Sequence, residues 1–382
     1  MAEEVKKAFM LAPMASVFER FSMANFNALK TLGCEIHVAA NFDSNEHDRE
    51  YALRLEGDGV VVHNIPFVRG SLFGNLKHLP EIRGILRAGD FDLVHCHTET
   101  GGILMRLAMA KNGRTKYVFT PHGMSFYKGG PLKGQLIYRP IERWICAAMD
   151  ANLAMNEEEL EVLQGWNRAT AKFIHGIGVS LESIQELDVD VAAKKAELGI
   201  PADALVVMSV GELNSNKNHT VVLDAIGKLK DTANIYYLIC GRGELRETLM
   251  EQAKDLGFAD RLILPGYRYD MAEIFHVGDI FVFPSFHEGL SVALMQSMIA
   301  GMPVICSKIR GNVDLIKDGK NGFLFSPKDS EALSVALQTL LDNQPQRKAM
   351  GDLNKKIING YSQQTVEKET YDIYNGLLSR YE

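Results

Sequence analysis

The residue types and spacing of segment 281–305, FVFPSFHEGLSVALMQSMIAGMPVI, favour the binding of an anion. Glu288 and Gly289 lie in a short loop after an apolar run, and a helix is expected to begin near Leu290 or Ser291. The first N–H groups of a helix are unpaired and lie at the positive end of its dipole. Glu288 would lie beside the bound anion, and Gly289 would let the backbone approach it closely. A glutamate that only stabilises the helix dipole is the alternative.

A second glycine-rich turn, CGRGELR, contains Gly241 and Gly243 between an expected strand and an expected helix. The turn is similar to the start of a dinucleotide-binding fingerprint. However, Arg246 occupies the position of the third glycine, and the turn does not lie in the first strand–helix–strand unit of its half. A lone Gly-x-Gly is weak evidence for a nicotinamide cofactor.

Three histidines could do chemistry in the first half of the chain. His122 follows an expected strand in a tight turn, where a purely structural role is the alternative to a catalytic one. His95 and His97 flank Cys96, and the sequence HCH is similar to a metal site. We expect the two side chains to point in opposite directions at a strand end, and no third ligand follows at short spacing. We therefore interpret HCH as structural.

Short apolar runs alternate with helix-length stretches along the whole chain, which predicts parallel sheets with helices on both faces. Helices are expected over 18–32, 101–110 and 134–148, among others. The apolar runs that we interpret as strands are 8–12, 35–40, 60–65, 93–95, 117–120, 151–155, 205–210, 235–240, 261–264, 280–284, 303–306 and 322–325.

The length of 382 residues favours two domains that share a cleft. A charged stretch after residue 184 separates the halves. Residues 1–180 and 181–361 are predicted to form two Rossmann-like, doubly wound domains. A last helix over 362–382 is expected to pack back on the first domain.

Composition excludes several classes of protein. The 41 basic and 48 acidic residues give a net charge of −7, which does not favour binding to nucleic acid. No run reaches the roughly 18 apolar residues of a membrane-spanning helix. The 5 cysteines form no C-x-x-C pair, so a reducing cytoplasm is the expected compartment.

The segment 281–305 resembles the E-x₇-E motif of the family-four retaining glycosyltransferases, which have the GT-B fold of two facing Rossmann-like domains. The resemblance covers nearly the whole chain and points to the enzymes that build bacterial exopolysaccharide, capsule or related glycans. The other matching segments are DLVHCHTETGG (92–102), TPHGMSF (120–126), AMNEEEL (154–160), HGIGV (175–179), VGELNSNKNH (210–219), ICGRGELRETL (239–249), PGYRYDMAEIFHVGDIFVFPS (265–285) and GNVDLIKDGKNGFLF (311–325).

The resemblance implies catalytic roles for three residues. Lys217, which follows a strand through a polar loop, would stabilise the negative charge that grows on the departing nucleoside diphosphate. A solvated loop lysine is the alternative. Glu288 would contact hydroxyls of the transferred sugar. His122 would reach toward the sugar or diphosphate from the acceptor-side domain, 1–180, while 181–361 would bind the nucleotide-sugar.

The resemblance also implies further donor-binding positions. Gly241 and Gly243 would border the nucleotide, and Arg268 would border the base, largely through its backbone. The N–H groups at 289–291, which belong to Gly289, Leu290 and Ser291, would bind the diphosphate.

Three departures from the family pattern concern these roles. The usual arginine after the glycine of the Lys217 loop is replaced by Glu212, and Arg242 is our candidate for the missing cation. Gln296 stands where the second glutamate of the motif accepts hydrogen bonds from ribose, and an amide oxygen can still accept them. Ala15 and Ser16 lie in an expected loop, 13–21, where many members carry paired glycines. That loop would border the acceptor.

The segment 127–144 combines basic and apolar side chains, with a net charge of +3. It suits an anionic membrane surface or a lipid-diphosphate head group, and an ordinary amphipathic helix packed on the sheet is the equal alternative. The residues concerned are Lys128, Lys133, Arg139, Arg143, Ile137, Tyr138, Ile141 and Trp144.

The sequence thus predicts a cytoplasmic retaining glycosyltransferase, peripheral at the inner face of the membrane. It would use a nucleotide-sugar, expected to be UDP-linked, and a glycan or polyprenyl-diphosphate-linked acceptor. No metal or cofactor is expected, and the D-x-D at 188–190 is interpreted as a solvated face of a helical stretch. The alternatives are a UDP-sugar epimerase or hydrolase of the same fold, a nicotinamide dehydrogenase, and a non-catalytic sugar-nucleotide sensor.

Overall fold

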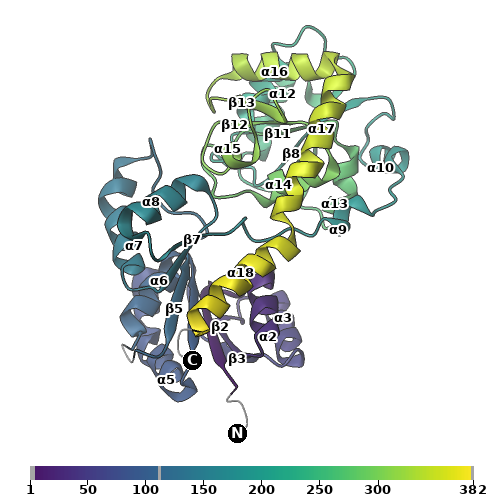
Figure 1. The fold of residues 1–382 in the computed structure, drawn as a ribbon. Coiled ribbons are helices and arrows are strands. Elements are labelled where there is room, and N and C mark those ends of the chain that lie inside the picture. Colours follow the sequence, from purple (N-terminus) through teal and green to yellow (C-terminus); the bar gives the residue numbers. More distant parts are fainter. Residues whose placement is uncertain (1–4, 111–112, 380–382) are drawn as a thin grey trace. The chain divides into compact units, whose positions relative to one another are not determined.

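The computed structural model describes residues 5–110 and 113–379. Its contacts divide the chain into two compact units (Figure 1). Unit 1 consists of Met1–Gly178 and Gln363–Glu382, and unit 2 of Val179–Ser362. Each unit contains one parallel sheet with helices on both faces, which confirms the predicted fold class.

The sheet of unit 1 has the strand order β3-β2-β1-β4-β5-β6-β7. Its strands are β1 (Lys7–Met14), β2 (Glu35–Asn41), β3 (Val61–Asn64), β4 (Leu93–His97), β5 (Lys116–Thr120), β6 (Ala151–Ala154) and β7 (Ala171–Phe173). Alternate residues of β1 enter opposite cores, with Met10 on one face and Phe9 and Leu11 on the other. The central strand is therefore buried on both sides, as an apolar run without alternation predicts.

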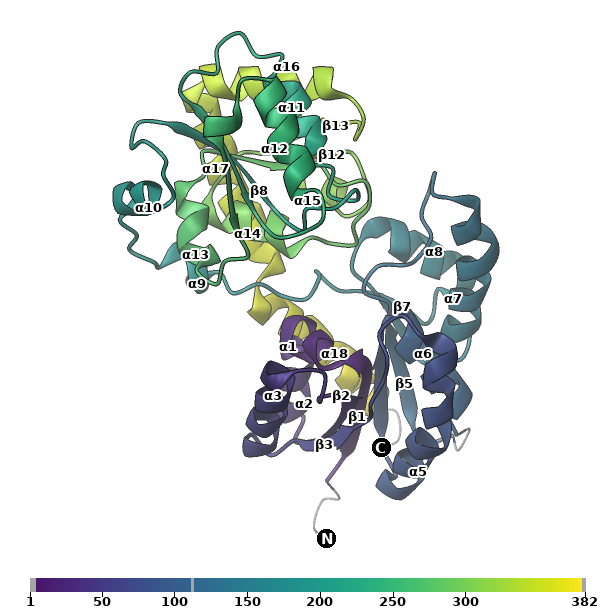
Figure 2. The ribbon, with the colours of Figure 1, turned by 180° about the vertical axis from the view of Figure 1, so that it is seen from behind.

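Two groups of helices cover this sheet (Figure 2). Phe18, Phe26 and Tyr374 pack on one face, and Ile82 and Ile145 pack on the other. The helical segments are α1 (Ala15–Phe21), α2 (Met23–Thr31), α3 (Glu46–Gly57), α4 (Leu72–Asn75), η1 (Leu76–His78), α5 (Leu79–Gly89), α6 (Thr98–Ala108), η2 (Gly134–Tyr138), α7 (Arg139–Cys146), α8 (Glu157–Asn167) and α18 (Gln363–Leu378).

Two expected elements of unit 1 differ from the structure. The expected loop over 13–21 is wrong, because β1 continues to Met14 and α1 begins at Ala15 without a connecting turn. The expected helix over 18–32 is two helices, which are separated at the buried Ser22. Its hydroxyl donates to the carbonyl of Val17 at 3.4 Å, a local bond that competes with continuation of the helix.

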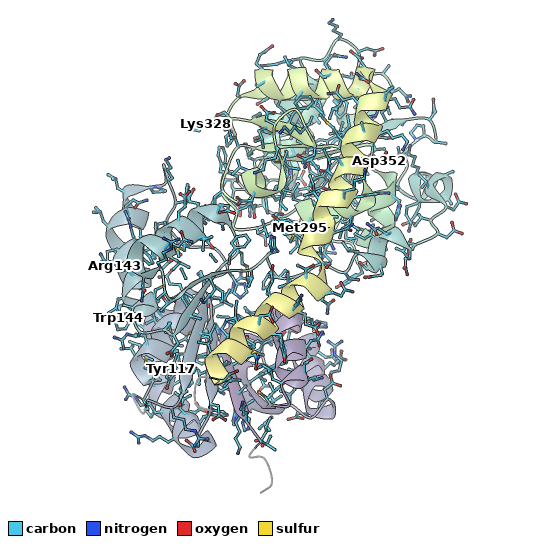
Figure 3. All side chains as sticks on the ribbon, in the orientation of Figure 1. Tyr117, Arg143, Trp144, Met295, Lys328 and Asp352 are labelled. Carbon is cyan, nitrogen blue, oxygen red and sulfur yellow. The ribbon has the colours of Figure 1, made fainter. Side chains whose placement is uncertain are left out.

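The sheet of unit 2 has the order β10-β9-β8-β11-β12-β13. Its strands are β8 (Leu205–Val210), β9 (Ile235–Cys240), β10 (Leu262–Gly266), β11 (Ile280–Phe283), β12 (Val304–Ser307) and β13 (Gly322–Phe325). Tyr117 of unit 1 and Met295 of unit 2, both labelled in Figure 3, are core residues with 5% and 0% exposure.

The helical segments of unit 2 are α9 (Glu182–Gln185), α10 (Val191–Glu197), α11 (Thr220–Ile226), α12 (Arg246–Asp255), η3 (Ala259–Arg261), α13 (Met271–Ile274), η4 (Phe275–Val277), α14 (Val292–Ala300), α15 (Asn312–Leu315), α16 (Ser330–Asp342), α17 (Gln344–Ile358) and η5 (Asn359–Tyr361). The D-x-D at 188–190 precedes α10 instead of lying within a helix, and the Asp190 carboxylate caps α10 by accepting from the N–H of Ala193. Among the described residues, no helix combines the length and apolar character needed to span a bilayer.

Candidate active site

Lys217 and Glu288 form an ion pair at the carboxyl edge of the sheet of unit 2. Lys217 Nζ lies 2.6 Å from Glu288 Oε1, and the two side chains are 20% and 16% exposed. Lys217 comes from the loop after β8 and Glu288 from the loop after β11, and these strands are neighbours in the sheet. Strand order reverses between them, at the switch point where ligands of open parallel sheets bind.

Neighbouring groups hold the side chain of Lys217 in this position. A Cβ on Gly211 would lie 3.1 Å from Cδ and Cε of Lys217, so a glycine leaves room for the aliphatic stem. The ammonium lies 4.9 Å from the ring centroid of Phe283, at the end of β11. The cation is therefore held by an aromatic ring as well as by Glu288.

Asparagines cross-link the loops of Lys217 and Glu288. Asn216 Nδ2 donates to the carbonyl of His287 at 3.1 Å, and the carbonyl of Asn216 accepts from the N–H of Phe286 at 2.8 Å. Asn218, in left-handed conformation at φ 55°, donates from Nδ2 to the carbonyl of Pro284 at 3.1 Å. These asparagines were not predicted from the sequence. The alternating asparagines of NSNKN were the available signal.

The structure confirms a helix start close to the predicted position. Ser291 caps α14, and its Oγ accepts from the N–H of Leu294 at 3.4 Å. Gly289 and Leu290 directly precede the cap and are half-buried. Gln296 lies in the second turn of α14 and is also half-buried. The cap of α14 thus lies three residues after Glu288, the carboxylate that pairs with Lys217.

Arg310 is a further cation that sequence analysis missed. The residue is 7% exposed, its Nη2 lies 2.9 Å from His287 Nε2, and its Nε donates to the carbonyl of Glu288 at 3.4 Å. A Cβ on the next residue, Gly311, would lie 1.7 Å from the carbonyl oxygen of Gly289. The loop after β12 thus packs directly against the loop that carries Glu288. An Arg-Gly pair just after a predicted strand was the only signal in the sequence.

The glycines of the predicted nucleotide turn are required by contact between two loops. A Cβ on Gly241 would lie 1.8 Å from the carbonyl oxygen of Gly211, and one on Gly243 would lie 2.3 Å from that of Leu213. Arg242 between them is exposed. This packing explains both glycines without a ligand, so their predicted contact with the nucleotide remains a prediction.

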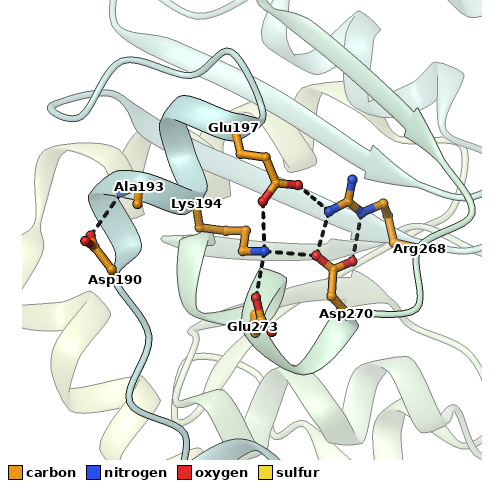
Figure 4. A network of polar contacts seen from close by, with 7 residues as sticks. All are labelled: Asp190, Ala193, Lys194, Glu197, Arg268, Asp270 and Glu273. Atoms are coloured by element: carbon orange, nitrogen blue, oxygen red, sulfur yellow. Dashed lines mark hydrogen bonds and ion pairs between the residues drawn. The ribbon is translucent and has the colours of Figure 1, made fainter.

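The side chain of Arg268 belongs to a network on the surface of unit 2 (Figure 4). Its Nε donates to Asp270 Oδ1 at 2.8 Å, and its Nη2 donates to Glu197 Oε1 at 2.5 Å. Lys194 joins the same network through Asp270 at 3.0 Å and Glu273 at 2.6 Å. Hydrogen bonding from Arg268 holds the pKa of the Asp270 carboxyl well below its usual range. The guanidinium of Arg268 ties α10 to the loop after β10. The predicted contact of Arg268 with the base would be made by its backbone and does not need this side chain.

In unit 1, His122 lies in a turn after β5 with a left-handed φ of 59°. Burial lowers its pKa to about 4, so the ring is neutral at pH 7. The expectation that the side chains of His95 and His97 point in opposite directions is wrong, because alternate residues of a strand share a face. Their ring centroids lie 4.0 Å apart inside β4, and Nδ1 of His97 lies 2.9 Å from Nε2 of His122.

The remaining predicted positions of unit 1 lie at the start of α1. Ala15 is fully buried in the core, and Ser16 is half-buried beside it. Among the described residues, no group of three or more histidine, cysteine, aspartate or glutamate side chains is arranged to hold a metal ion.

Two family models match consecutive parts of the chain. Residues 19–174 match the glycosyl transferase 4-like domain, and residues 190–357 match the glycosyl transferases group 1. The chain belongs to the family-four-type glycosyltransferases. The dehydrogenase alternative is therefore wrong.

Sequence relatives match this glycosyltransferase over nearly its whole length. The putative glycosyltransferase EpsD of Bacillus subtilis is 29% identical over 381 residues, which cover 98% of this chain and 97% of EpsD. The UDP-Gal:alpha-D-GlcNAc-diphosphoundecaprenol alpha-1,3-galactosyltransferase of Escherichia coli is 28% identical over 359 residues, 92% of each chain.

Solved structures show the same GT-B fold. HepE of Anabaena in complex with UDP has a TM-score of 0.79 at 16% identity, over 97% of this glycosyltransferase and 100% of that chain. Sucrose-phosphate synthase from Thermosynechococcus elongatus has a TM-score of 0.80 at 17% identity. The match covers 98% of this glycosyltransferase and 99% of the synthase chain.

Proposed function

We propose that this glycosyltransferase moves a sugar from a UDP-sugar to a glycan or lipid-linked acceptor, with retention, in the synthesis of a bacterial surface polysaccharide. The Lys217–Glu288 pair beside the start of α14 is the observation that carries the proposal. It combines a held cation, a carboxylate and free helix N–H groups, which suit a sugar diphosphate. The names of relatives support the substrates: HepE was solved with UDP and with UDP-glucose, and the Escherichia coli relative uses UDP-Gal and a diphosphoundecaprenol acceptor.

The chemistry follows from the charges at this site. As the bond from the anomeric carbon to the diphosphate breaks, negative charge grows on the phosphate oxygens, and Lys217 stabilises it. Glu288 then exchanges its contact with Lys217 for hydroxyls of the sugar. The acceptor attacks on the face that the diphosphate leaves, and the leaving phosphate takes the acceptor proton. The protein supplies no nucleophile in this scheme.

A second cation would offset the loss of the family arginine at position 212. Arg242 is exposed at the end of β9, whereas Arg310 is buried beneath the loop of Glu288. We assign direct contact with the diphosphate to Arg242, because the Arg310 guanidinium already holds His287 and the Glu288 carbonyl. In this proposal, protein cations replace a metal ion.

The proposal is tested with purified protein, a panel of UDP-sugars and a polyprenyl-diphosphate-linked saccharide. We expect UDP release that requires the acceptor and continues in EDTA, and a glycoside with the anomeric configuration of the donor. Release of free sugar without acceptor would show that the protein is a UDP-sugar hydrolase. Interconversion of UDP-sugars would show that it is an epimerase. Calorimetric binding of UDP without turnover of any donor would support the sensor. Inversion or a strict metal requirement would contradict the mechanism.

We also propose that the segment 127–144 contacts an anionic membrane surface. Its outer face carries Leu132 and Leu136, which are 77% and 72% exposed. Glu142, the acidic residue of the segment, is 1% exposed and accepts from the N–H of Ser125, so the exposed charges of the segment are all positive. Arg143 and Trp144, labelled in Figure 3, line an adjoining groove of about 460 Å³. Exposed leucines beside cations suit the interface of an anionic bilayer.

Sedimentation with phosphatidylglycerol and phosphatidylcholine vesicles tests this contact. We expect binding to the anionic vesicles alone, weakened by Leu136→Ser. Leu53→Ser is the matched control, since Leu53 is 67% exposed on α3. Equal loss in both variants, or equal binding to both lipids, would contradict a specific membrane face.

A further inference from the structure

Three histidine rings stack where β4 and β5 end in unit 1. The ring centroids of His95 and His97 lie 4.0 Å apart, and those of His97 and His122 lie 5.2 Å apart. His97 Nδ1 and His122 Nε2 are 2.9 Å apart, so one of these nitrogens carries the hydrogen of a shared hydrogen bond. Burial lowers the pKa of all three rings, which are therefore neutral at pH 7. Each ring then has one N–H and one lone pair.

The other nitrogen of His97 decides the direction of this bond. Within residues 5–110 and 113–379, His97 Nε2 is buried and has no hydrogen-bond partner. A buried N–H without a partner is costlier and rarer than a buried acceptor without one. The hydrogen of His97 therefore lies on Nδ1 and is donated to Nε2 of His122. His122 accepts at Nε2, so it must carry its own hydrogen on Nδ1.

We propose that His97 is a positioning residue that holds His122 as the Nδ1–H tautomer, so that His122 presents a hydrogen-bond donor to bound substrate. The proposal rests on the proposed function, to which we add the role that the family resemblance implies for His122, a contact with the sugar or diphosphate. Among the hydrogen bonds of the described residues, the His122 ring makes one, through Nε2, so its Nδ1–H is left for a ligand. Oxygens of a sugar or diphosphate are acceptors that such a donor fits.

A separate chain of hydrogen bonds fixes the ring beneath His97. The hydroxyl of Tyr374, on the C-terminal helix α18, accepts from Asn25 Nδ2 at 2.8 Å. The hydroxyl hydrogen of Tyr374 is fully buried, and His95 Nδ1, 2.6 Å away, is the acceptor that it reaches, so Tyr374 donates to His95. His95 must then donate from Nε2 to Thr120 Oγ1, at 2.8 Å. The edge-on ring of Phe18, with its centroid 5.9 Å from that of His97, closes the other side. The stack thus leaves His97 little freedom to turn.

Nitrogen-15 NMR of histidine-labelled protein measures the tautomer directly, because protonated and unprotonated ring nitrogens have distinct shifts. The His122 signals are assigned by their loss in His122→Gln. At pH 7 we expect a protonated Nδ1 and an unprotonated Nε2 on His122. In His97→Leu we expect His122 to lose its preference for the Nδ1–H tautomer. We expect kcat to fall about 3- to 10-fold, which corresponds to the loss of one hydrogen bond, and the KM for the donor to change little. His97→Asn, whose amide can donate from nearly the same place, should restore much of kcat.

Thr120→Val is the matched control, since it removes a hydrogen bond of the stack that does not involve His97 or His122. It should leave the tautomer of His122 unchanged. An Nε2–H tautomer of His122 in the unaltered protein would overturn the proposal, because it would place the His97 hydrogen on the buried Nε2 atom that has no hydrogen-bond partner among the described residues. An unchanged tautomer or unchanged kcat in His97→Leu would overturn it too. The NMR result needs no turnover, so failure of the proposed function would show separately as absent transfer with every donor.

Discussion

Replacement of Lys217 by methionine separates its chemical role from its structural one. Methionine keeps the length and apolar character of the stem that lies over Gly211, and it removes the ammonium. The variant therefore loses the 2.6 Å contact with Glu288 and any contact with a phosphate. These two losses act on different measurements, the first on stability and the second on turnover.

The magnitudes follow from burial and charge. Hydrogen bonds to charged groups contribute about 1.5–3 kcal/mol, which predicts a fall in kcat/KM of about 10- to 150-fold. Unpairing a fully buried charge costs about 3–5 kcal/mol. The side chain of Glu288 is 16% exposed, so we expect a loss of about 1–3 kcal/mol in the free energy of unfolding. Adding Glu288→Gln removes the unpaired charge and should restore most of the stability without restoring turnover.

The assay compares kcat/KM for UDP release, UDP affinity by calorimetry and unfolding in urea for the single and double variants. Lys228→Met is the matched control, because Lys228 pairs with Glu331 at 3.0 Å and both side chains are largely exposed, at 41% and 74%. It should change stability by less than about 1 kcal/mol and leave turnover unchanged. If Lys217→Met keeps the unaltered kcat/KM and UDP affinity, Lys217 does not act on the phosphate.

Two further predictions concern the backbone and pH. In Gly311→Ala, the new Cβ would lie 1.7 Å from the carbonyl of Gly289, so the Glu288 loop must move, and we expect kcat/KM to fall at least about tenfold. Gly319→Ala, with a similar positive φ but no atom within 4 Å, should lower stability by about 1 kcal/mol without changing turnover; equal kinetics in both variants would refute the loop argument. Burial lowers the pKa of His95 to about 3 from 6.5, so the unfolded chain binds more protons between these pH values. Stability should therefore fall as the pH drops from 6.5 to 5, by about 2 kcal/mol for this histidine, and a flat urea-unfolding profile there would contradict the neutral stack.

Buried strands were the part of the fold that the sequence predicted best. Residues 322–325 were expected as a strand and are β13, because a short apolar run between turn residues has few other uses in a parallel sheet. The strand β7 at 171–173 was missed, since it lies at the edge of the sheet, is only half-buried and has no apolar run. A single serine at position 22 divides the predicted helix 18–32, and one polar residue in a helical pattern is not a recognisable break.

The contacts among His95, His97 and His122 could not be predicted from the sequence, for a different reason. HCH was recognised as unusual, but its geometry was predicted wrongly, because residues two apart in a strand share a face. The partner of His97 could not be predicted by spacing at all. It depends on the pairing of β4 with β5, which places His97 opposite Thr120, two residues before His122.

The order of the strands in the sheet of unit 2 decides which residues meet at the candidate active site. Along the chain, Lys217, Glu288 and Arg310 come from loops separated by other strands and helices, and each residue alone has an ordinary structural explanation. In the sheet, β8, β11 and β12 are consecutive neighbours, so the three loops meet at one edge. Lys217 and Glu288 were predicted through a family motif, but their contact with each other was not. Arg310 and the asparagines were not predicted, because they contact backbone carbonyls of another loop and, for Arg310, also the side chain of His287. No spacing of side-chain types along the chain encodes such contacts.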